Sequence, residues 1–228
     1  MTPQVRMIDD FGLLRASYWR RDRLDTRLRV TAAGSPAKEP DMRNVVLIMT
    51  ASIDGYVVAP KEHAGGLPEP DELKRWKLDR IRRAGTHIMG RVTYEEMAAA
   101  WPASTDDYAA PMNDIPKVVF SKTLSEATWP ESSIARGDLA AEIKVLKNQS
   151  GGEIIAWGGA EFAQALSRAG LIDQYVIVVQ PVAFGGGKPM FRNLRDALHL
   201  RLLGTTTFPS GTMLHLYQPR GWGAQGSE

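Results

Sequence analysis

The sequence predicts one α/β domain over residues 42–218, preceded by an N-terminal extension, 1–41, and followed by a short tail, 219–228. Short runs of β-branched and apolar residues alternate with helical stretches from Asn44 onward, and this alternation is typical of an α/β fold. The 228 residues are enough to bury a full core, and a content of 43% hydrophobic and 24% charged residues is that of a globular protein. No stretch reaches the roughly 18 consecutive apolar residues of a membrane helix, so we expect no membrane partner.

The predicted strands are short and rich in branched apolar residues. A strand buried on both faces of a sheet is expected to be apolar throughout, as the run Val45–Met49 is, and this run ends at the turn pair Asp54-Gly55. The C-terminal region has two strand-like runs around Pro209-Ser210-Gly211, which predicts an antiparallel hairpin. The predicted strands are Val45–Met49, Thr86–Met89, Lys117–Phe120, Glu153–Ala156, Gln174–Val179 and the hairpin of 200–208 and 212–218.

The predicted helices lie between these strands and have recognisable ends. The first helix begins near Asp71, where acidic residues favour the N-terminal end of the helix dipole, and stops before Gly85. The last helix is expected to end at a capping glycine, Gly170. The predicted helices run from about Asp71 to Ile81, Thr93 to Ala100, Asp138 to Lys147 and Ala160 to Ala169.

The N-terminal extension accounts for the whole net charge of +2. It holds eight Lys or Arg and six Asp or Glu, which leaves 20 residues of each sign in 42–228. A body without net charge argues against a large surface for nucleic acid. The imperfect amphipathic pattern of 1–41 fits a docking arm for a partner or an acidic surface. The alternatives are a plain appendage, or an upstream start codon with the natural start at Met42.

The chain has no cysteine, which excludes disulfides, thiolate metal sites and a cysteine nucleophile. Such a composition suits the cytoplasm, where we expect the protein to be. The four histidines, His63, His87, His199 and His215, have no metal-ligand spacing, so no metal site is predicted. His87 and His215 fall within predicted strands, where we expect hydrogen-bonded core histidines.

Three predicted strand ends lead into residues suited to binding phosphate. Parallel α/β sheets bind ligands at the carboxyl ends of their strands, and helix N-termini offer free N–H groups there. Taken one by one, these residues could equally be tight turns, a surface cation or a helix cap. None matches the Gly-x-Gly-x-x-Gly dinucleotide motif or a P-loop. The three sequences are Gly90-Arg91-Val92-Thr93, Ser121-Lys122 and Gly158-Gly159-Ala160.

These motifs, together with Ser52-Ile53-Asp54-Gly55, Gly170-Leu171-Ile172-Asp173 and Gly185-Gly186-Gly187-Lys188-Pro189, resemble the dihydrofolate-reductase-like family in order and spacing. That family includes the C-terminal reductase domain of the bifunctional riboflavin-biosynthesis protein, and the resemblance covers residues 42–218. It implies a three-layer α/β/α fold with a central, mostly parallel sheet and a reversed C-terminal strand. It also implies NADPH as the cofactor and a homodimer.

The resemblance also assigns cofactor roles to particular residues. Thr50 and Ala51 would lie beside the nicotinamide, and Ser121 and Lys122 would help to hold the 2′-phosphate. The remaining residues would contact the diphosphate and the adenosine-side phosphate: Gly90, Arg91, Thr93, Gly158, Gly159 and Ala160. In dihydrofolate reductases the corresponding glycine pair is joined by a cis peptide, which costs about 3 kcal/mol without proline.

The catalytic acid is not assigned to one residue by the sequence. In folate reductases a carboxylate lies on the helix after the first strand, and Asp71, with Glu72 beside it, is the nearest match. Asp71 could also be a plain helix cap, since it follows Pro70. Asp54 is the other candidate, although Asp-Gly is an ordinary turn pair.

The predicted function is an NADPH-dependent reductase that transfers hydride to a small heterocycle, such as a pterin, a pyrimidine or a flavin-like compound. The alternative is a nucleotide-binding module without turnover. The chain departs from the riboflavin enzyme because the deaminase half and its zinc-ligand pattern are missing and because Arg91 is more basic than that enzyme's pattern. We therefore expect a stand-alone member with a different small-molecule substrate.

Overall fold

The computed structural model describes residues 42–60 and 68–220. The predicted extension, 1–41, lies outside the described residues, as does the predicted tail from residue 221 onward. The first two tail residues, Pro219 and Arg220, continue the C-terminal hairpin. In the described part of the chain, no helix has the length and apolar character needed to cross a membrane.

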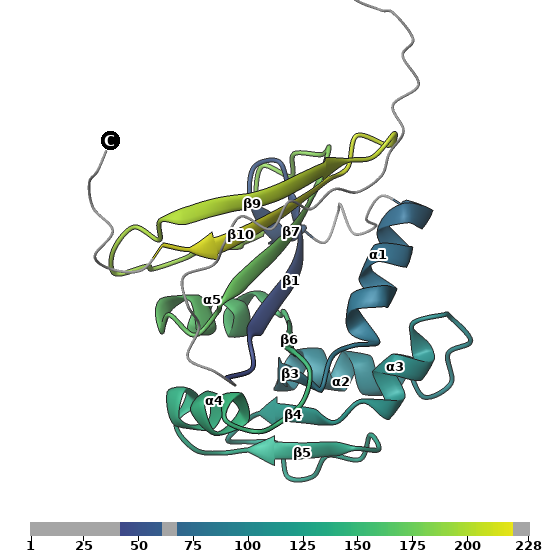
Figure 1. Cartoon of the computed structure of the whole chain (residues 1–228), viewed down its shortest axis with the longest axis vertical. Helices are drawn as coiled ribbons and strands as arrows, with labels where there is room; N and C mark the ends of the chain where they lie inside the picture. The colour runs from purple at the N-terminus through teal and green to yellow at the C-terminus, as the bar shows by residue number, and fades with distance from the viewer. Residues whose placement is uncertain (1–41, 61–67, 221–228) are drawn as a thin grey trace, which may run out of the picture. The chain divides into compact units, whose positions relative to one another are not determined.

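The centre of the described structure is one large sheet (Figure 1). Within the described residues it has eight strands in the order β5-β4-β3-β6-β1-β7-β10-β9. Neighbouring strands from β5 to β7 are parallel, whereas β10 is antiparallel to both β7 and β9. The predicted mostly parallel sheet with a reversed C-terminal strand is confirmed. The strands are β1 Val45–Ser52, β3 Thr86–Gly90, β4 Lys117–Phe120, β5 Ser132–Ala135, β6 Ile154–Trp157, β7 Gln174–Gln180, β9 Leu200–Thr207 and β10 Met213–Pro219.

Helices cover both faces of this sheet, which confirms the three-layer prediction. On one face lie α1 Asp71–Ile81, α2 Arg91–Ala100 and the short α3 Ala109–Asp114; on the other lie α4 Leu139–Lys147 and α5 Ala160–Arg168 (Figure 1). Each face has its own apolar core, and β1 contributes to both because its side chains alternate between the two. Its first five residues are 0–7% exposed, as predicted for a strand covered on both sides.

Four short elements were not predicted from the sequence. Strand β5 and helix α3 are too short, and β5 too polar, to give a periodic pattern. A two-stranded sheet joins β2 Tyr56–Val58 to β8 Lys188–Pro189, so the turn after β1 is tied to the glycine-rich loop after β7. Gly170 has φ +65° just after α5, which is the left-handed cap that the sequence predicted.

The amino ends of the central strands are fixed by buried cations. Arg43 donates hydrogen bonds to the carbonyl oxygen of Gly152 at 2.6 Å and to Oγ1 of Thr86 at 2.8 Å. The side chain of Lys117 donates to three carbonyl oxygens at the end of α3 and just beyond it, at 2.7–3.1 Å. These bonds satisfy polar groups that would otherwise be costly to bury, and they tie α3 to the start of β4.

Candidate cofactor and substrate site

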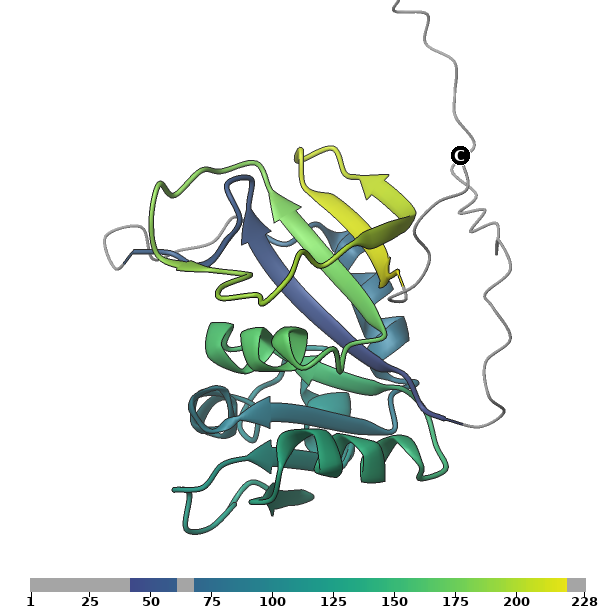
Figure 2. The ribbon, with the colours of Figure 1, turned by 90° about the vertical axis from the view of Figure 1, so that its left-hand side faces the viewer.

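The predicted phosphate-binding residues follow neighbouring strands at the carboxyl edge of the sheet. Strands β4, β3, β6 and β1 are adjacent, and Gly90 pairs with Phe120 while Ile48 pairs with Trp157. In Figure 2 the arrowheads of β1 and β7, in dark blue and light green, point to the left. The ends of β4, β3 and β6 therefore open toward the same edge as Thr50 and Ala51, which lie near the end of β1.

Side chains from α2 and α5 bring the three bends into contact. The ring of Phe162 on α5 lies 5.3 Å, centroid to centroid, from the ring of Phe120, which ends β4. A Cβ at Gly90 would lie only 3.3 Å from the Cβ of Phe162, and a Cβ at Gly159 would lie 2.8 Å from Oγ1 of Thr93. The structure thus brings together three segments that are far apart in the sequence.

The absence of a side chain is needed at both glycines of the β6–α5 bend. A Cβ at Gly158 would collide with Sδ of Met49, and one at Gly159 would press on Thr93. Within the described residues there is no cis peptide bond, so Gly158 and Gly159 are joined in trans, unlike the pair in dihydrofolate reductases. The close packing leaves backbone as the only surface that this bend can offer to a ligand.

Helices α2 and α5 begin at these bends without side-chain caps. Their N-cap residues are Gly90 and Gly159, both in extended conformation and neither with a side chain that could accept a hydrogen bond. Helix α4 differs, because the carboxylate of its N-cap Asp138 accepts from the N–H groups of Ala140 and Ala141 at 3.0 Å. The starts of α2 and α5 are therefore suited to an anion, whose charge both helix dipoles would stabilise.

The predicted cations lie at the surface of this edge. Arg91 is exposed and forms a 2.9 Å ion pair with Glu95 one turn further along α2. Lys122 is exposed as well. The hydroxyl of Ser121 accepts hydrogen bonds from the N–H groups of Thr123 and Leu124 at 3.2 and 2.9 Å, so it also holds the turn that carries Lys122.

Arg136 is a further cation beside this turn that the sequence reasoning missed. It follows β5, whose last residue, Ala135, accepts a hydrogen bond from the backbone N–H of Ser121 at 3.2 Å. Its guanidinium donates to the carbonyl oxygens of Leu124 and Ser125 at 2.6 and 3.3 Å. No sequence signal could have found it, because β5 is too short and too polar to be predicted as a strand.

Asp54 is held by hydrogen bonds at the turn after β1. Its carboxylate accepts from the hydroxyl of Ser52 at 2.5 Å, from the N–H of Gly185 at 2.8 Å and from the N–H of Phe184 at 3.2 Å. The Ser52 hydroxyl, followed by the Gly185 N–H, lowers the pKa of Asp54 below its ordinary value. A carboxylate in this state is a poor proton donor near neutral pH and instead joins the turn to the loop after β7.

Asp71 lies in the first turn of α1 and is exposed. The N-cap residue is Pro70, so the alternative that Asp71 is itself the helix cap is wrong. The physical reason is that Pro70 already has the extended conformation of an N-cap, with φ −60° and ψ 140°, while Asp71 has entered the helix. Because α1 follows β1 and ends near the amino edge, Asp71 lies toward the carboxyl edge.

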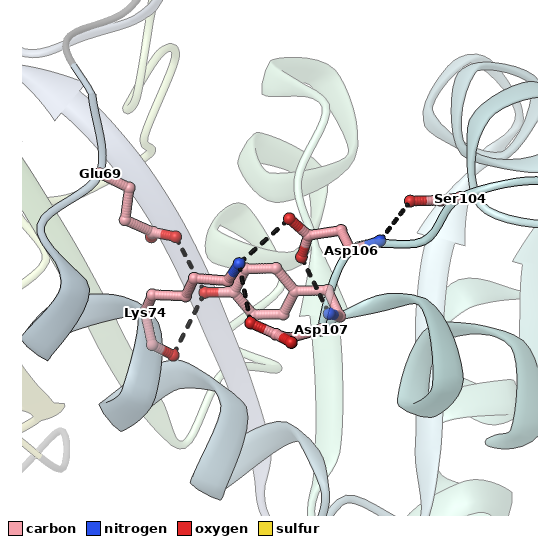
Figure 3. A network of polar contacts seen from close by, with 6 residues as sticks. Glu69, Lys74, Ser104, Asp106 and Asp107 are labelled. Atoms are coloured by element: carbon pink, nitrogen blue, oxygen red, sulfur yellow. Dashed lines mark hydrogen bonds and ion pairs between the residues drawn. The ribbon is translucent and has the colours of Figure 1, made fainter.

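A polar network connects the start of α1 to the loop before α3 (Figure 3). Lys74 forms 3.1 Å ion pairs with both Asp106 and Asp107. The hydroxyl of Tyr108 donates to the carboxylate of Glu69 at 3.0 Å, and burial, followed by the Glu69 charge, raises the pKa of Tyr108 above its ordinary value. The network fixes the beginning of α1, and with it the position of Asp71.

Trp157 and His87 form a hydrogen-bonded pair beneath α1–α3. Trp157 is the last residue of β6, directly before Gly158, and its Nε1–H donates to Nδ1 of His87 at 2.9 Å. His87 is fully buried, and its Nε2 lies 3.3 Å from the carbonyl oxygen of Pro111. Burial lowers the pKa of His87 from 6.5 to about 4, so the ring is neutral at neutral pH. The prediction of a hydrogen-bonded core histidine is confirmed for His87. It is wrong for His215, which is only partly buried because it lies on β10 near the edge of the sheet.

One surface hollow of the described residues lies away from the carboxyl edge of the sheet. A hollow lined by Trp76, Arg80, Arg83 and Glu153 lies at the amino edge, where Arg80 forms a bidentate ion pair with Glu153. Across residues 42–60 and 68–220, no three His, Asp or Glu side chains are grouped so that they could hold a metal ion.

Residues 43–214 match the RibD C-terminal domain family. The uncharacterized protein YwjB of Bacillus subtilis (strain 168) is 29% identical over 174 residues, which are 76% of this chain and 97% of YwjB. A putative riboflavin biosynthesis protein from Shewanella sp. PV-4 has a similar structure, with a TM-score of 0.64 and 22% identity over 78% of this chain and 99% of its own. A dihydrofolate reductase from Enterococcus faecalis, complexed with NADP(H), gives a TM-score of 0.54 and 16% identity over 78% of this chain and 96% of its own. The predicted dihydrofolate-reductase-like fold is thereby confirmed.

Proposed function

The chain belongs to the RibD C-terminal domain family, and from this membership we propose that it is an NADPH-dependent reductase of a small heterocyclic compound. The observation that carries the proposal is the meeting of two uncapped helix N-termini, those of α2 and α5, at Gly90 and Gly159. A diphosphate bridging these two helix starts would accept backbone hydrogen bonds from both.

The residues present fit such a dinucleotide. Gly158 and Gly159 leave bare backbone at the bend, with Ala160 opening α5 behind them and Thr93 packed against Gly159. In this proposal, Gly90 and Thr93 bind the diphosphate, Arg91 reaches the adenosine-side phosphate, and Thr50 and Ala51 lie beside the nicotinamide ring. Thr50 is exposed at the carboxyl end of β1, whereas Ala51 is buried.

Three cations would distinguish NADPH from NADH. Lys122 lies in the turn that the Ser121 hydroxyl holds, Arg136 donates to a carbonyl oxygen of that turn, and Arg91 begins α2 directly after the neighbouring strand β3. A 2′-phosphate among these groups gains charge-assisted hydrogen bonds that NADH cannot form. Arg91 is already paired with Glu95, so on binding a 2′-phosphate its guanidinium would either leave Glu95 or contact Glu95 and the phosphate together.

The chemistry supplied by bound NADPH is hydride donation to a C=N or C=O bond of the substrate. This chain's residues orient the two reactants and provide the proton that the reduced product requires. We assign proton delivery to Asp71, directly or through a water molecule, because the Asp54 carboxylate is occupied by three donors and has a lowered pKa. In this scheme, Asp54 orders the turn beside the nicotinamide.

The experiment that tests the proposed function mixes the full chain with NADPH or NADH and follows the loss of reduced-nicotinamide absorbance with pterins, pyrimidines and flavins. We expect tighter binding of NADPH than of NADH and oxidation with at least one of these heterocycles. Failure to bind NADPH in calorimetry would overturn the proposal.

A second function, a nucleotide-binding module without turnover, is favoured by one observation. Asp54, one of the two candidate acids, is committed to the loop that contains Gly185. If Asp71 is not an acid either, the site binds NADPH without delivering a proton. Tight NADPH binding with no oxidation across the same panel would select this function.

We also propose that the protein is a homodimer and that residues 42–218 form its reductase domain. Among the described residues, strand β9 forms one of the two edges of the sheet, and its Leu202 and Leu203 are 51% and 37% exposed. An apolar edge strand of this kind is commonly paired or covered. Light scattering after size-exclusion chromatography should give twice the chain mass of 25.1 kDa, whereas a monomer mass would overturn the proposal. The cytoplasmic location stays a prediction.

A further inference from the structure

Trp157 lies at the end of β6, directly before the β6–α5 bend, on the face of the sheet that α1 covers. It ends β6, lies in register with Ile48 of β1 and is followed by the two glycines of the bend. Its side chain packs with the apolar core beneath α1–α3, but it is only partly buried. Part of Trp157 is therefore exposed.

A substrate would have to lie on this same face. The nicotinamide is proposed to lie at the end of β1, and the candidate acid Asp71 lies on α1, which packs against the face that carries Trp157. A heterocycle that reaches both the nicotinamide and Asp71 therefore approaches β1 and β6 from the side of α1. Planar conjugated rings are stabilised by offset or edge contacts with aromatic side chains, beyond the effect of the area that they bury.

The hydrogen bonds of His87 fix the plane of the Trp157 indole. An indole N–H can only donate, so Nδ1 of His87 must be the acceptor and the ring proton must be on Nε2. That proton then points to the carbonyl oxygen of Pro111, 3.3 Å away on α3. Both ring nitrogens of His87 therefore have hydrogen-bond partners, which offsets the cost of burying this polar ring completely.

We propose that the Trp157 indole is the aromatic surface on which the heterocyclic substrate packs, and that His87 is the positioning residue that fixes the plane of this indole. The inference rests on the proposed function and names a determinant of its substrate class, a flat conjugated ring system. The groups that face His87 are Trp157 from β6, Pro111 from α3 and the charge of Lys117 from β4.

The test uses the full chain labelled with 5-fluorotryptophan and read by ¹⁹F NMR. The chain has six tryptophans, and Trp157→Phe identifies the Trp157 resonance. Two probes are added to the NADP⁺-saturated protein, 7,8-dihydropterin and lumichrome. We expect either probe to shift the Trp157 resonance more than that of Trp129, which is 2% exposed on the same face.

The variants His87→Phe and His87→Gln separate positioning from folding. We expect His87→Phe to broaden or split the Trp157 resonance and to raise KM for the heterocycle at least fivefold, with less than a twofold change in the Kd of NADPH. His87→Gln keeps an acceptor and should restore part of the effect. The matched control is Asn113→Leu, because Asn113 accepts from the Nε1–H of another indole, Trp129, at 2.8 Å. If the hydrogen bond of His87 is purely structural, His87→Phe and Asn113→Leu should both lower Tm and leave KM unchanged.

The outcomes distinguish this inference from the proposed function. If NADPH binds but neither probe moves the Trp157 resonance, or if His87→Phe leaves KM unchanged, the inference is overturned and the reductase proposal stands. If NADPH does not bind, the proposed function fails and the inference fails with it. A shift of Trp157 by a probe that is bound but not reduced supports the inference without turnover.

Discussion

The carboxylate of Asp54 accepts a 2.8 Å hydrogen bond from the backbone N–H of Gly185, a residue 131 positions further along the chain. Two backbone bonds accompany it: Ile53 N–H donates to Val182 oxygen at 2.9 Å, and Met190 N–H donates to Gly55 oxygen at 2.8 Å. The turn after β1 and the loop after β7 therefore behave as one unit beside the end of β1. Asp54 is the only one of these residues whose side chain makes the connection.

Asp54→Asn should weaken this connection without removing a proton donor. We expect kcat/KM to fall on the order of tenfold, because a loosened loop changes kcat and KM together. The shape of the pH–rate profile should stay the same, since the Asp54 carboxylate has a lowered pKa and remains ionised across the neutral range. Steady-state kinetics from pH 5 to 9 give the measurement. Disappearance of the basic limb in the variant, which is the loss of activity as a general acid ionises with rising pH, would instead identify Asp54 as the proton donor.

Asp71→Asn tests the other candidate acid. Removal of a general acid lowers kcat by about 10²–10⁴-fold, and we expect a loss in this range with an unchanged Kd for NADPH. Glu72→Gln is the matched control, because Glu72 is its neighbour in the first turn of α1 and is paired with Arg75 at 3.8 Å. Equal, small losses in both variants would show that the two carboxylates act only on the helix dipole.

Gly159→Ala should weaken cofactor binding through backbone displacement. The new Cβ would lie 2.8 Å from Oγ1 of Thr93, so either α2 or the β6–α5 bend has to move. We expect the Kd of NADPH to rise at least tenfold, which corresponds to ~1.4 kcal/mol. Calorimetric titration provides the measurement, with Gly204→Ala in β9 as the control, because a Cβ there meets nothing closer than 3.9 Å. An unchanged Kd in Gly159→Ala would remove this bend from the cofactor site.

Arg91→Ala and Arg136→Ala should reduce the preference for NADPH over NADH. Each guanidinium would contribute a charge-assisted hydrogen bond to the 2′-phosphate, so we expect NADPH affinity to fall about tenfold or more and NADH affinity to change little. Arg201→Ala is the control, since Arg201 pairs with Gln218 in the distant β9–β10 hairpin. Equal losses for both cofactors would exclude the varied arginine from recognition of the 2′-phosphate.

The buried His87 should make stability depend on pH. Its pKa is about 4 in the folded protein and 6.5 as the ordinary value, so between these values the unfolded chain binds more protons than the folded one. The contribution of His87 to the free energy of unfolding is therefore fully present above pH 6.5. It is lost as the pH is lowered toward 4, which decreases the free energy of unfolding by roughly 3 kcal/mol. Urea unfolding at pH 7.0 and 4.5 measures the loss. Between pH 7.0 and 4.5, the free energy of unfolding of His87→Gln should decrease less than that of the wild type. The decrease for the control His215→Gln should equal that of the wild type, and an equal decrease in all three proteins would contradict the prediction.

The strong sequence patterns predicted the long elements correctly. The run Val45–Met49 is apolar at every position because it is covered on both faces. The acidic first turn marks the start of the first helix, which ends at Ile81, before Gly85 as predicted. The short elements β5, α3, β2 and β8 carry no such pattern, because they are held by neighbours distant in the chain. The roles of the site residues were implied by resemblance to a family and stay predictions.

The sequence by itself determined the alternation of strands and helices and the three bends suited to phosphate, because periodicity and glycine positions are local properties of the chain. Only the tertiary structure decided which groups meet. Strand order brings the bends at Gly90 and Gly159 together and places Arg136 near Ser121. Packing commits Asp54 to Gly185 and pairs Trp157 with His87. These contacts depend on the packing of segments far apart in the sequence, and no local pattern records which of the possible neighbours a residue will have.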